Sequence, residues 1–294
     1  MNPIGEVMRA LGDGDVLAPL DVQIARVLVR RSDESGDRAL ATSICAAFTS
    51  KACREGHSAI TIARIVEQAR EARKELGGAT ASALPDEGDA WWTSTLKDSA
   101  CVSDGTTLTP LVLREGVLQF WRYYAAEGRI ARRVREMVAA NGESPAFSII
   151  TGGPGTGKTT TAARVLVELA ERTPHLRVAL AAPTGKAAAR LTESMRLRFD
   201  EIKGGDGARA YPAADARTLH RLLGYSQHKD AFTNNADNPL GEDVVIVDEA
   251  SMVDVLMMDA LLRATKPGAR LMLVGDHNQL ASVDAGDVPE PRPP

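Results

Sequence analysis

The stretch SIITGGPGTGKTTTAARVLVEL, residues 148–169, decides the fold of the second half of this 294-residue chain. A short apolar run leads into a glycine-rich loop, and apolar residues at helical spacing follow the loop. From Gly152 to Thr159 the loop fits the pattern G-x-x-x-x-G-K-S/T, in the strand–loop–helix setting that a phosphate-binding loop requires. We therefore predict that this segment holds the phosphates of a nucleotide.

Each residue type in this loop has a role in phosphate binding. Glycines let the backbone turn its N–H groups toward phosphate oxygens, and the helix that begins near Lys158 adds its positive end. Lys158 neutralises the β- and γ-phosphates, and Thr159 offers its hydroxyl to Mg²⁺. The residues expected to contact ATP are Gly152, Gly153, Pro154, Gly155, Thr156, Gly157, Lys158, Thr159 and Thr160.

Acidic residues follow a second apolar run, VVIVDEAS at residues 244–251. We predict that Asp248 holds Mg²⁺ through water and that Glu249 orients and activates the attacking water. A pair of acids that caps a helix is the alternative for these two residues. A third run, LVGDHNQL at residues 273–280, brings Asp276 and Gln279 to a strand end, where an amide would report whether the γ-phosphate is present. The predicted catalytic residues are Lys158, Asp248, Glu249 and Gln279, and the predicted metal ligands are Thr159 and Asp248.

Hydrophobic spacing predicts an α/β domain over residues 146–288. Four short runs rich in Val, Ile and Leu are each followed by Gly, Pro or Asp, which is typical of buried parallel strands joined by helices. The runs are FSIITGG, VALAAPTG, DVVIVDEAS and RLMLVGD, and they start at residues 147, 178, 243 and 270. We therefore expect a P-loop domain with a parallel sheet, whose ligands bind at the carboxyl ends of the strands. Residues 289–294 are expected to be a disordered, proline-rich tail.

Residues 1–140 are expected to form a mostly helical domain. Apolar spacing predicts helices over residues 19–32, 39–56, 60–78 and 118–140, and a strand over residues 105–113. Gly77 and Gly78 are expected to end the third helix. The basic face formed by Arg129, Arg132, Arg133 and Arg135 is interpreted as solvated rather than as a patch for DNA or a partner. Packing is preferred to base stacking for Trp91, Trp92, Trp121, Tyr123 and Tyr124.

The composition excludes several classes of protein. The chain is 44% hydrophobic and 25% charged with a formal net charge of −4, which is ordinary for a globular protein and shows no basic excess. Cys45, Cys53 and Cys101 lack the spacing of a zinc site or a disulfide framework. No apolar run reaches the roughly 18 residues of a membrane span, and residues 1–15 contain no hydrophobic signal core. We expect a cytoplasmic protein that does not contact a membrane.

Five motifs in one order resemble a known family. After the phosphate loop come AAPTGKAAARLTES (181–194), ARTLHRLLGY (216–225), NPLGEDVVIVDEASMVD (238–254) and LVGDHNQLASVDAG (273–286). Together they resemble the superfamily 1 helicases, and specifically the family of RecD subunits of RecBCD-type exonuclease V. The segment REGHSAI (54–60) is similar to the N-terminal domain of that family, more weakly.

The resemblance implies a RecA-like ATPase domain and an ATP-driven 5′→3′ motor on single-stranded DNA. It also implies RecB-like and RecC-like partner subunits in double-strand break repair and recombination, with the N-terminal domain docking on the RecC-like subunit. Thr184, Gly185 and Lys186 open a predicted helix, which is an anion site that would hold a DNA phosphate. Thr218 and His220 would donate to the DNA backbone in the same sequence-independent way.

The sequence departs from the pattern of the family in three ways. It stops soon after the fifth motif, before the second RecA-like domain whose arginines stabilise the transition state. The ending DVPEPRPP is expected to mark a truncation, a frameshift or a remnant of cloning. No glutamine stands shortly before the phosphate loop to read adenine. A non-catalytic fragment that binds nucleotide, DNA or a partner is therefore the main alternative, whereas a small-molecule kinase would not need the motifs at 181–194 and 216–225.

Overall fold

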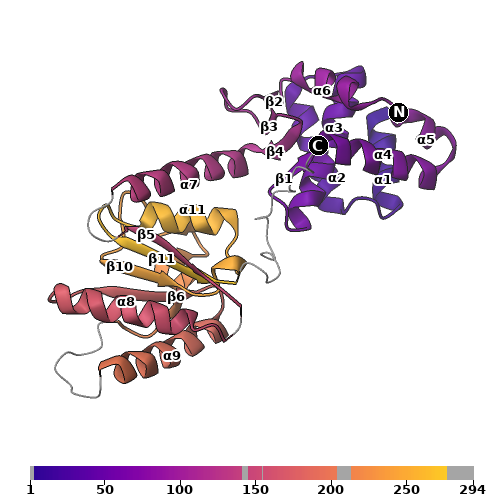
Figure 1. The fold of residues 1–294 in the computed structure, drawn as a ribbon. Helices are drawn as coiled ribbons and strands as arrows, with labels where there is room; N and C mark the ends of the chain where they lie inside the picture. The colour runs from indigo at the N-terminus through magenta and orange to yellow at the C-terminus, as the bar shows by residue number, and fades with distance from the viewer. Residues whose placement is uncertain (1–2, 141–144, 154, 204–212, 277–294) are drawn as a thin grey trace. The chain divides into compact units, whose positions relative to one another are not determined.

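The computed structural model describes residues 3–140, 145–153, 155–203 and 213–276 (Figure 1). These residues form two compact units, of which the first ends at Ala126 and the second begins at Glu127. Pro154, Gln279 and the proline-rich tail were singled out in the sequence, and they lie outside the described residues.

The first unit combines helices with a small sheet. Its helices are α1 (Pro3–Asp13), α2 (Pro19–Ser32), α3 (Gly36–Arg54), α4 (Ile62–Leu76), α5 (Gly78–Ala83) and α6 (Asp89–Lys97). Its strands are β1 (Ala59–Thr61), β2 (Val102–Ser103), β3 (Leu111–Arg114) and β4 (Val117–Phe120), in the order β1-β4-β3-β2. Helix α7 (Trp121–Ala139) follows, and its residues from Glu127 onward belong to the second unit. The predicted helical character is confirmed, and the sheet is an addition to it.

Strand pairing explains three predicted boundaries that were wrong. The third helix was expected from Ile60, but Ile60 and Thr61 pair with β4, and α4 begins at Ile62 under a cap in which Thr61 accepts the N–H of Arg64 at 3.2 Å. The last helix was expected from residue 118, but residues 117–120 form β4. The strand expected over residues 105–113 is confined to residues 111–114, where β3 pairs with β4.

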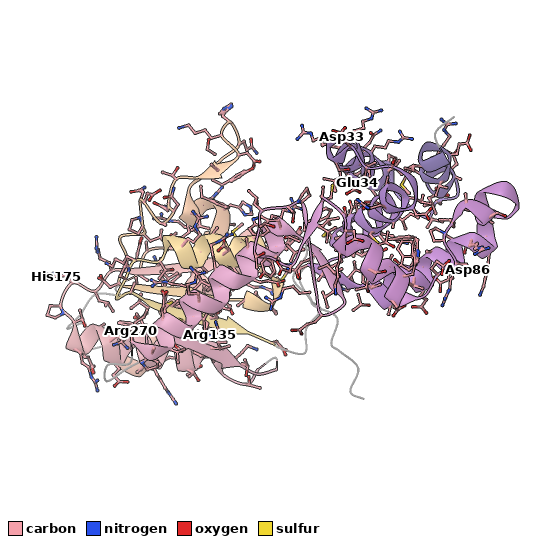
Figure 2. All side chains as sticks on the ribbon, turned by 90° about the horizontal axis from the view of Figure 1, so that it is seen from above. Asp33, Glu34, Asp86, Arg135, His175 and Arg270 are labelled. Carbon is pink, nitrogen blue, oxygen red and sulfur yellow. The ribbon has the colours of Figure 1, made fainter. Side chains whose placement is uncertain are left out.

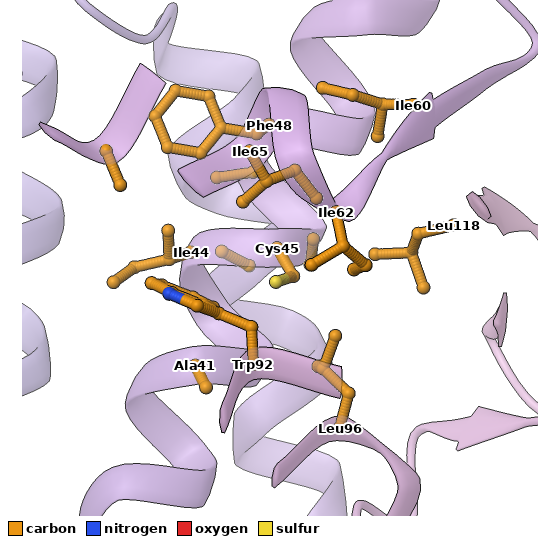
Figure 3. Close-up of a cluster of buried hydrophobic side chains, with 14 of the residues drawn as sticks. Ala41, Ile44, Cys45, Phe48, Ile60, Ile62, Ile65, Trp92, Leu96 and Leu118 are labelled. Carbon is orange, nitrogen blue, oxygen red and sulfur yellow. The ribbon is translucent and has the colours of Figure 1, made fainter. Parts of the chain in front are cut away.

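Helix α3 lies at the centre of the core of the first unit. Ile44, Cys45 and Phe48 on this helix are fully buried, and Trp92 of α6 and Leu118 of β4 belong to the same cluster (Figure 3). A helix buried on nearly all sides carries no amphipathic stripe, since every face must be apolar or small. The interpretation of Trp92 as a packing residue is confirmed.

A buried carboxylate joins α2 to α3. Asp21 accepts hydrogen bonds from the guanidinium of Arg54 at 2.7 Å, the hydroxyl of Ser50 at 2.7 Å and the backbone N–H of Ala18 at 2.9 Å. Burial alone would raise the pKa of Asp21, but these donors together hold the pKa below its usual value. The last donor also closes the N-terminus of α2, so one side chain both caps a helix and fixes its neighbour.

The second unit is built on a parallel sheet, as the four apolar runs predict, and its strand order is β5-β11-β10-β6-β7, in which β7 is a fifth strand that no run predicted. The strands are β5 (Phe147–Thr151), β6 (Val178–Ala182), β7 (Arg217–Thr218), β10 (Val244–Val247) and β11 (Arg270–Gly275). Strand β10 is buried on both faces, because Val244 and Ile246 pack into one core and Val245 and Val247 into the other. A strand covered on both sides reads as a continuous apolar run, which is why the sequence reveals it.

Helices cover both faces of this sheet (Figure 1). Helices α8 (Lys158–Arg172) and α9 (Gly185–Lys203) contribute to the core on one face. Helices α10 (Leu219–Leu223) and α11 (Val255–Ala264) and the second half of α7 contribute to the core on the other face. The remaining elements are the hairpin β8 (Tyr225–Ser226) and β9 (Ala231–Phe232) and the 3₁₀ turn η1 (Ala250–Met252). This layered arrangement leaves the carboxyl ends of the strands at one edge, where the candidate site lies.

Candidate functional site

The glycine-rich loop runs from the end of β5 at Thr151 to the start of α8 at Lys158. Gly157 closes the loop in the left-handed region at φ 84°, directly before α8. A Cβ atom on Gly152 would lie 2.5 Å from Oγ1 of Thr156, so only glycine fits where the loop turns back. Thr156 holds this turn by donating its hydroxyl to the carbonyl of Gly153 at 2.9 Å. The predicted loop and the predicted start of the helix are both confirmed.

Lys158 lies in the hollow of this loop. Its Nζ donates to the carbonyl oxygens of Gly152 and Gly153, the second at 3.0 Å. An ammonium group held by two neutral carbonyls would gain from exchanging them for phosphate oxygens, because the phosphate adds the attraction of a full negative charge. Lys158 is therefore placed to bind a phosphate anion in exchange for these two carbonyl groups.

Asp248 and Glu249 come directly after β10. Asp248 donates its backbone N–H to the carbonyl of Ala181 at 2.9 Å and accepts the N–H of Glu249 on its carboxylate at 2.9 Å. Burial raises the pKa of Asp248, while the Glu249 N–H and the nearby charge of Lys158 oppose the rise. A divalent cation beside this carboxylate would favour its ionised form.

Glu249 has a left-handed backbone with a φ of 52°. This conformation costs an ordinary residue on the order of 1–2 kcal/mol, and non-glycine residues that adopt it concentrate at functional sites. Glu249 precedes η1 without a capping hydrogen bond from its side chain, so the alternative of a simple helix-capping acid is not supported.

A cavity of about 310 Å³ joins the loop to the two acidic residues, within the range of small-molecule sites. It is lined by Gly153, Gly155, Thr156, Gly157, Lys158, Thr159, Thr160, Ser194, Arg198, Asp248 and Glu249. The Thr159 hydroxyl and the Asp248 carboxylate are hard oxygen donors that suit Mg²⁺, which is usually held by one or two protein groups together with substrate phosphates. Among the described residues no cluster of three His, Cys, Asp or Glu side chains forms a separate metal site.

Two residues of this cavity, Ser194 and Arg198, were not predicted. They lie one turn apart on α9, more than thirty residues after the loop in sequence. Their spacing indicates only that they share a face of the helix. Which face meets the loop is decided by the packing of α9 against α8, so no local pattern identifies them.

The end of β11 carries the start of the fifth motif, and it lies next to the segment that follows the acidic residues Asp248 and Glu249. A Cβ atom on Gly275 would lie 3.3 Å from the backbone nitrogen of Ser251, so the glycine allows the end of β11 to approach the 3₁₀ turn that follows Glu249. Asp276 is buried at this strand end. Gln279, the predicted phosphate sensor, lies outside the described residues.

The predicted DNA-contacting residues lie at two neighbouring helix starts. Thr184 caps α9 by accepting the N–H of Ala187 at 3.2 Å, and Gly185 and Lys186 beside it are exposed. Thr218 caps α10 by accepting the N–H of Arg221 at 3.3 Å. Because Thr218 pairs with Ala182 in the parallel sheet, both helix starts lie at the same edge.

The side chain of His220 lies in an exposed aromatic cluster. Its ring forms a T-shaped pair with the ring of Tyr225 at 5.5 Å between ring centres, and Phe232 stands beside both. A second cavity of about 670 Å³ is lined by His220, Arg221, Gly224, Tyr225, Ser226, Gln227, His228 and Thr233. Polar donors and aromatic faces on one surface are the combination used by proteins that bind single strands.

The arginine face of α7 makes contacts that its prediction did not include. Arg129 donates to both carboxylate oxygens of Asp259 on α11 at 2.8–3.1 Å, and Arg133 donates to the carbonyl of Thr265 at 3.1 Å. Arg129 is exposed, as expected of a solvated face, and Arg133 is half-buried, but both also attach α7 to the segment of α11 and Thr265. Arg132 and Arg135 are exposed as expected, and Arg135 is labelled in Figure 2.

The sheet, the loop and the acidic pair define a P-loop nucleotide-binding domain, and residues 134–285 match the family described as "AAA domain". Residues 13–118 match "RecBCD enzyme subunit RecD, N-terminal domain". The chain therefore belongs to the AAA domain family over residues 134–285, and before this domain it carries a match to the N-terminal domain of RecD subunits.

Several known proteins are similar to this chain. The RecBCD enzyme subunit RecD of Mycobacterium tuberculosis is 34% identical over 96% of this chain and 51% of its own length. The subunit of the same name from Haemophilus influenzae is 51% identical over 51% of this chain and 24% of its own length. The ATP-dependent RecD2 DNA helicase of Deinococcus radiodurans is 46% identical over 47% of this chain and 16% of its own length.

The chain spans about half the length of the mycobacterial relatives that it matches. None of the helices in the described ranges is both long enough and apolar enough to cross a lipid bilayer.

Proposed function

We propose that this chain is the ATP-binding part of a DNA helicase subunit of the RecD type. It would translocate 5′→3′ on single-stranded DNA within a RecBCD-type exonuclease V, in double-strand break repair and recombination. The observation that carries the proposal is the cavity that joins Lys158, Thr159, Asp248 and Glu249 at the edge of the sheet where α9 and α10 also begin. A motor must couple its nucleotide site to its contacts with DNA, and sites that adjoin on one packed sheet can be coupled through the side chains and strands between them.

In this proposal each residue of the cavity has a defined task. The backbone N–H groups of Gly152, Gly153, Gly155, Thr156 and Gly157, together with Thr160, hold the phosphates, and Lys158 leaves its carbonyl partners to neutralise them. Thr159 and Asp248 would hold Mg²⁺, which bridges phosphate oxygens and neutralises the charge that develops on them. Glu249 orients and deprotonates the attacking water, and Gln279 senses the γ-phosphate.

For DNA, we propose sequence-independent contacts to the backbone. Thr184, Gly185 and Lys186 present a helix N-terminus and an ammonium group, which together attract a phosphate. Thr218 can donate its hydroxyl hydrogen while its oxygen caps α10, and His220 lies beside it on an exposed surface.

A groove in the first unit supports docking on a RecC-like subunit, beside a RecB-like one. Ile24, Leu108, Thr109, Pro110, Phe120, Trp121 and Arg122 line an apolar groove of about 540 Å³. Leu108 is 78% exposed, and Leu20 and Val27 on α2 are also about half exposed. Exposed apolar side chains that gather in one region mark interaction surfaces. Leu108→Glu is expected to weaken co-purification with a RecC-like subunit, whereas Thr107→Glu on the same exposed loop should not, and equal retention by both variants would exclude the groove.

We also propose a division of labour along the chain, in a protein that works in the cytoplasm. Residues 1–140 would form the partner-docking domain, residues 146–288 the ATPase domain and residues 289–294 a proline-rich tail.

The experiment that tests the proposed function is ATP hydrolysis by the purified chain with and without single-stranded DNA. Lys158→Ala is expected to abolish nucleotide binding, and Glu249→Gln is expected to keep binding and lose hydrolysis. Nucleotide binding that survives Lys158→Ala would refute the assignment of the site. Binding that requires Lys158 but gives no turnover would favour the second candidate, a non-catalytic nucleotide-binding protein.

A further inference from the structure

One wall of the nucleotide cavity comes from α9, and it carries a guanidinium group. Ser194 and Arg198 line the cavity from this helix, together with Thr159 and Thr160 at the start of α8. None of the motifs that indicate the family assigns a task to Arg198, which lies four residues after the last residue of the segment 181–194.

The charges that line the cavity indicate that Arg198 helps the site to accept an anion. Lys158 and Arg198 are cations, and Asp248 and Glu249 are carboxylic acids, so the formal charges of the lining balance. Without Arg198 the lining would carry an excess of negative charge when both acids are ionised. ATP remains an anion after it binds Mg²⁺, so a lining with an excess of negative charge would repel it.

The present partner of Arg198 can be exchanged at little cost. Its Nη1 donates to the carboxylate of Glu201 at 2.6 Å, one turn further along α9, and the two side chains are 43% and 49% exposed. Exposed ion pairs of this spacing stabilise a helix by only about 0.3–0.5 kcal/mol. A guanidinium bound to phosphate in a partly enclosed cavity forms shorter, bidentate and stronger hydrogen bonds.

We propose that Arg198 is a phosphate-binding residue of this nucleotide site, which moves from Glu201 to a phosphate oxygen when nucleotide enters. The inference rests on the proposed function, because it assumes that the cavity takes a nucleotide. It adds a ligand from α9 to the ligands of the loop and the acidic motif. No bond forms or breaks in this exchange apart from hydrogen bonds and ion pairs.

Arg196 provides a matched control for this proposal. It lies two residues away on the same helix, is 56% exposed, and pairs with Asp215 at 2.6 Å. It carries the same charge and a similar surface ion pair, but it does not line the cavity. Any effect of removing a positive charge from α9 in general must therefore be shared by both variants.

The test is calorimetric titration of the full chain and its variants with Mg-ATP and with Mg-tripolyphosphate, each variant having been checked by thermal unfolding without ligand. Arg198→Ala is expected to weaken the binding of both ligands about tenfold, because a hydrogen bond to a charged group is lost. Arg196→Ala should remain within about twofold of the parent chain. Glu201→Gln should bind as tightly as the parent or more tightly, because it releases Arg198 from a competing carboxylate.

Each remaining outcome decides against one part of the argument. If Arg198→Ala binds both ligands like the parent while Lys158→Ala binds neither, the inference is wrong and the proposed function stands. If Lys158→Ala also binds normally, the proposed function fails. Loss of Mg-ATP binding with unchanged Mg-tripolyphosphate binding would move the contact from the phosphates to the nucleoside. An equal loss of affinity in Arg196→Ala would show that Arg198 acts only as a general positive charge on α9. A loss of affinity in Glu201→Gln that parallels the loss in Arg198→Ala would show that the Arg198–Glu201 ion pair is only structural.

Discussion

Arg129→Ala should destabilise the second unit through the carboxylate that it leaves behind. Arg129 reaches both oxygens of Asp259 at 2.8–3.1 Å, and the Asp259 side chain is only 8% exposed. Removing the partner of a fully buried charge costs ~3–5 kcal/mol, whereas an exposed pair is worth ~0–1 kcal/mol. Because Arg129 itself is 43% exposed, water screens the pair in part, and the expected loss is about 2 kcal/mol.

The two units can be followed separately in the assay. All three tryptophans, Trp91, Trp92 and Trp121, lie in the first unit, so tryptophan fluorescence reports mainly on that unit. Circular dichroism reports on both units, and the difference between the two signals isolates the second. A loss of 2 kcal/mol in a unit of this size should lower its thermal midpoint by roughly 4–8 °C, while the fluorescence midpoint stays in place.

Arg135→Ala is the matched control, because Arg135 is exposed on the same helix. Equal midpoints for Arg129→Ala and Arg135→Ala would refute the conclusion that the ion pair attaches α7 to α11. Combining Arg129→Ala with Asp259→Ala should recover part of the loss, since the carboxylate left unpaired by the first substitution is then removed. Fully additive losses would refute the same conclusion in a second way.

Three further predictions concern the nucleotide cavity. Gly152→Ala should abolish nucleotide binding, measured by calorimetry, because the new Cβ would lie 2.5 Å from Thr156 Oγ1 and push the loop open; normal binding would show that the turn can relax. Asp248→Asn should raise the thermal midpoint of the ligand-free chain at neutral pH. Burial raises the pKa of Asp248, so the ionised carboxylate opposes folding above that pKa. The increase in midpoint should vanish as the pH falls toward the ordinary pKa of 3.8. The same variant should lose most of the stabilisation that Mg-nucleotide provides, and a midpoint unchanged at every pH would contradict the burial of this carboxylate. In urea unfolding, the free energy of unfolding of Glu249→Gly should exceed that of Glu249→Ala by about 1 kcal/mol, because only glycine adopts a φ of 52° without strain. The reverse order would exclude a left-handed backbone at this position.

The sequence by itself determined the parts of this protein whose physics is local. The phosphate loop is one of them, because glycine spacing, Lys158 and the flanking strand and helix all lie within 22 consecutive residues. The parallel strands are another, since burial on both faces requires a continuous apolar run such as VVIV in β10. The positions of Asp248 and Glu249 followed, because any residue that ends a parallel strand lies at the ligand-binding edge.

Tertiary structure decided what depends on a partner distant in sequence. Ile60 and Thr61 have helical neighbours, but hydrogen bonds to β4 make them a strand, and the same pairing delays the start of α7 to Trp121. Arg129 and Arg135 belong to the same basic face in sequence, and only the packing of α11 gives the first of them a carboxylate partner. Arg198 joined the cavity for the same reason, because the packing of α9 against α8 selects which of its faces meets the loop. Local spacing indicates which residues share a face of a helix. Which element that face contacts depends on the free energy gained by packing across the whole fold.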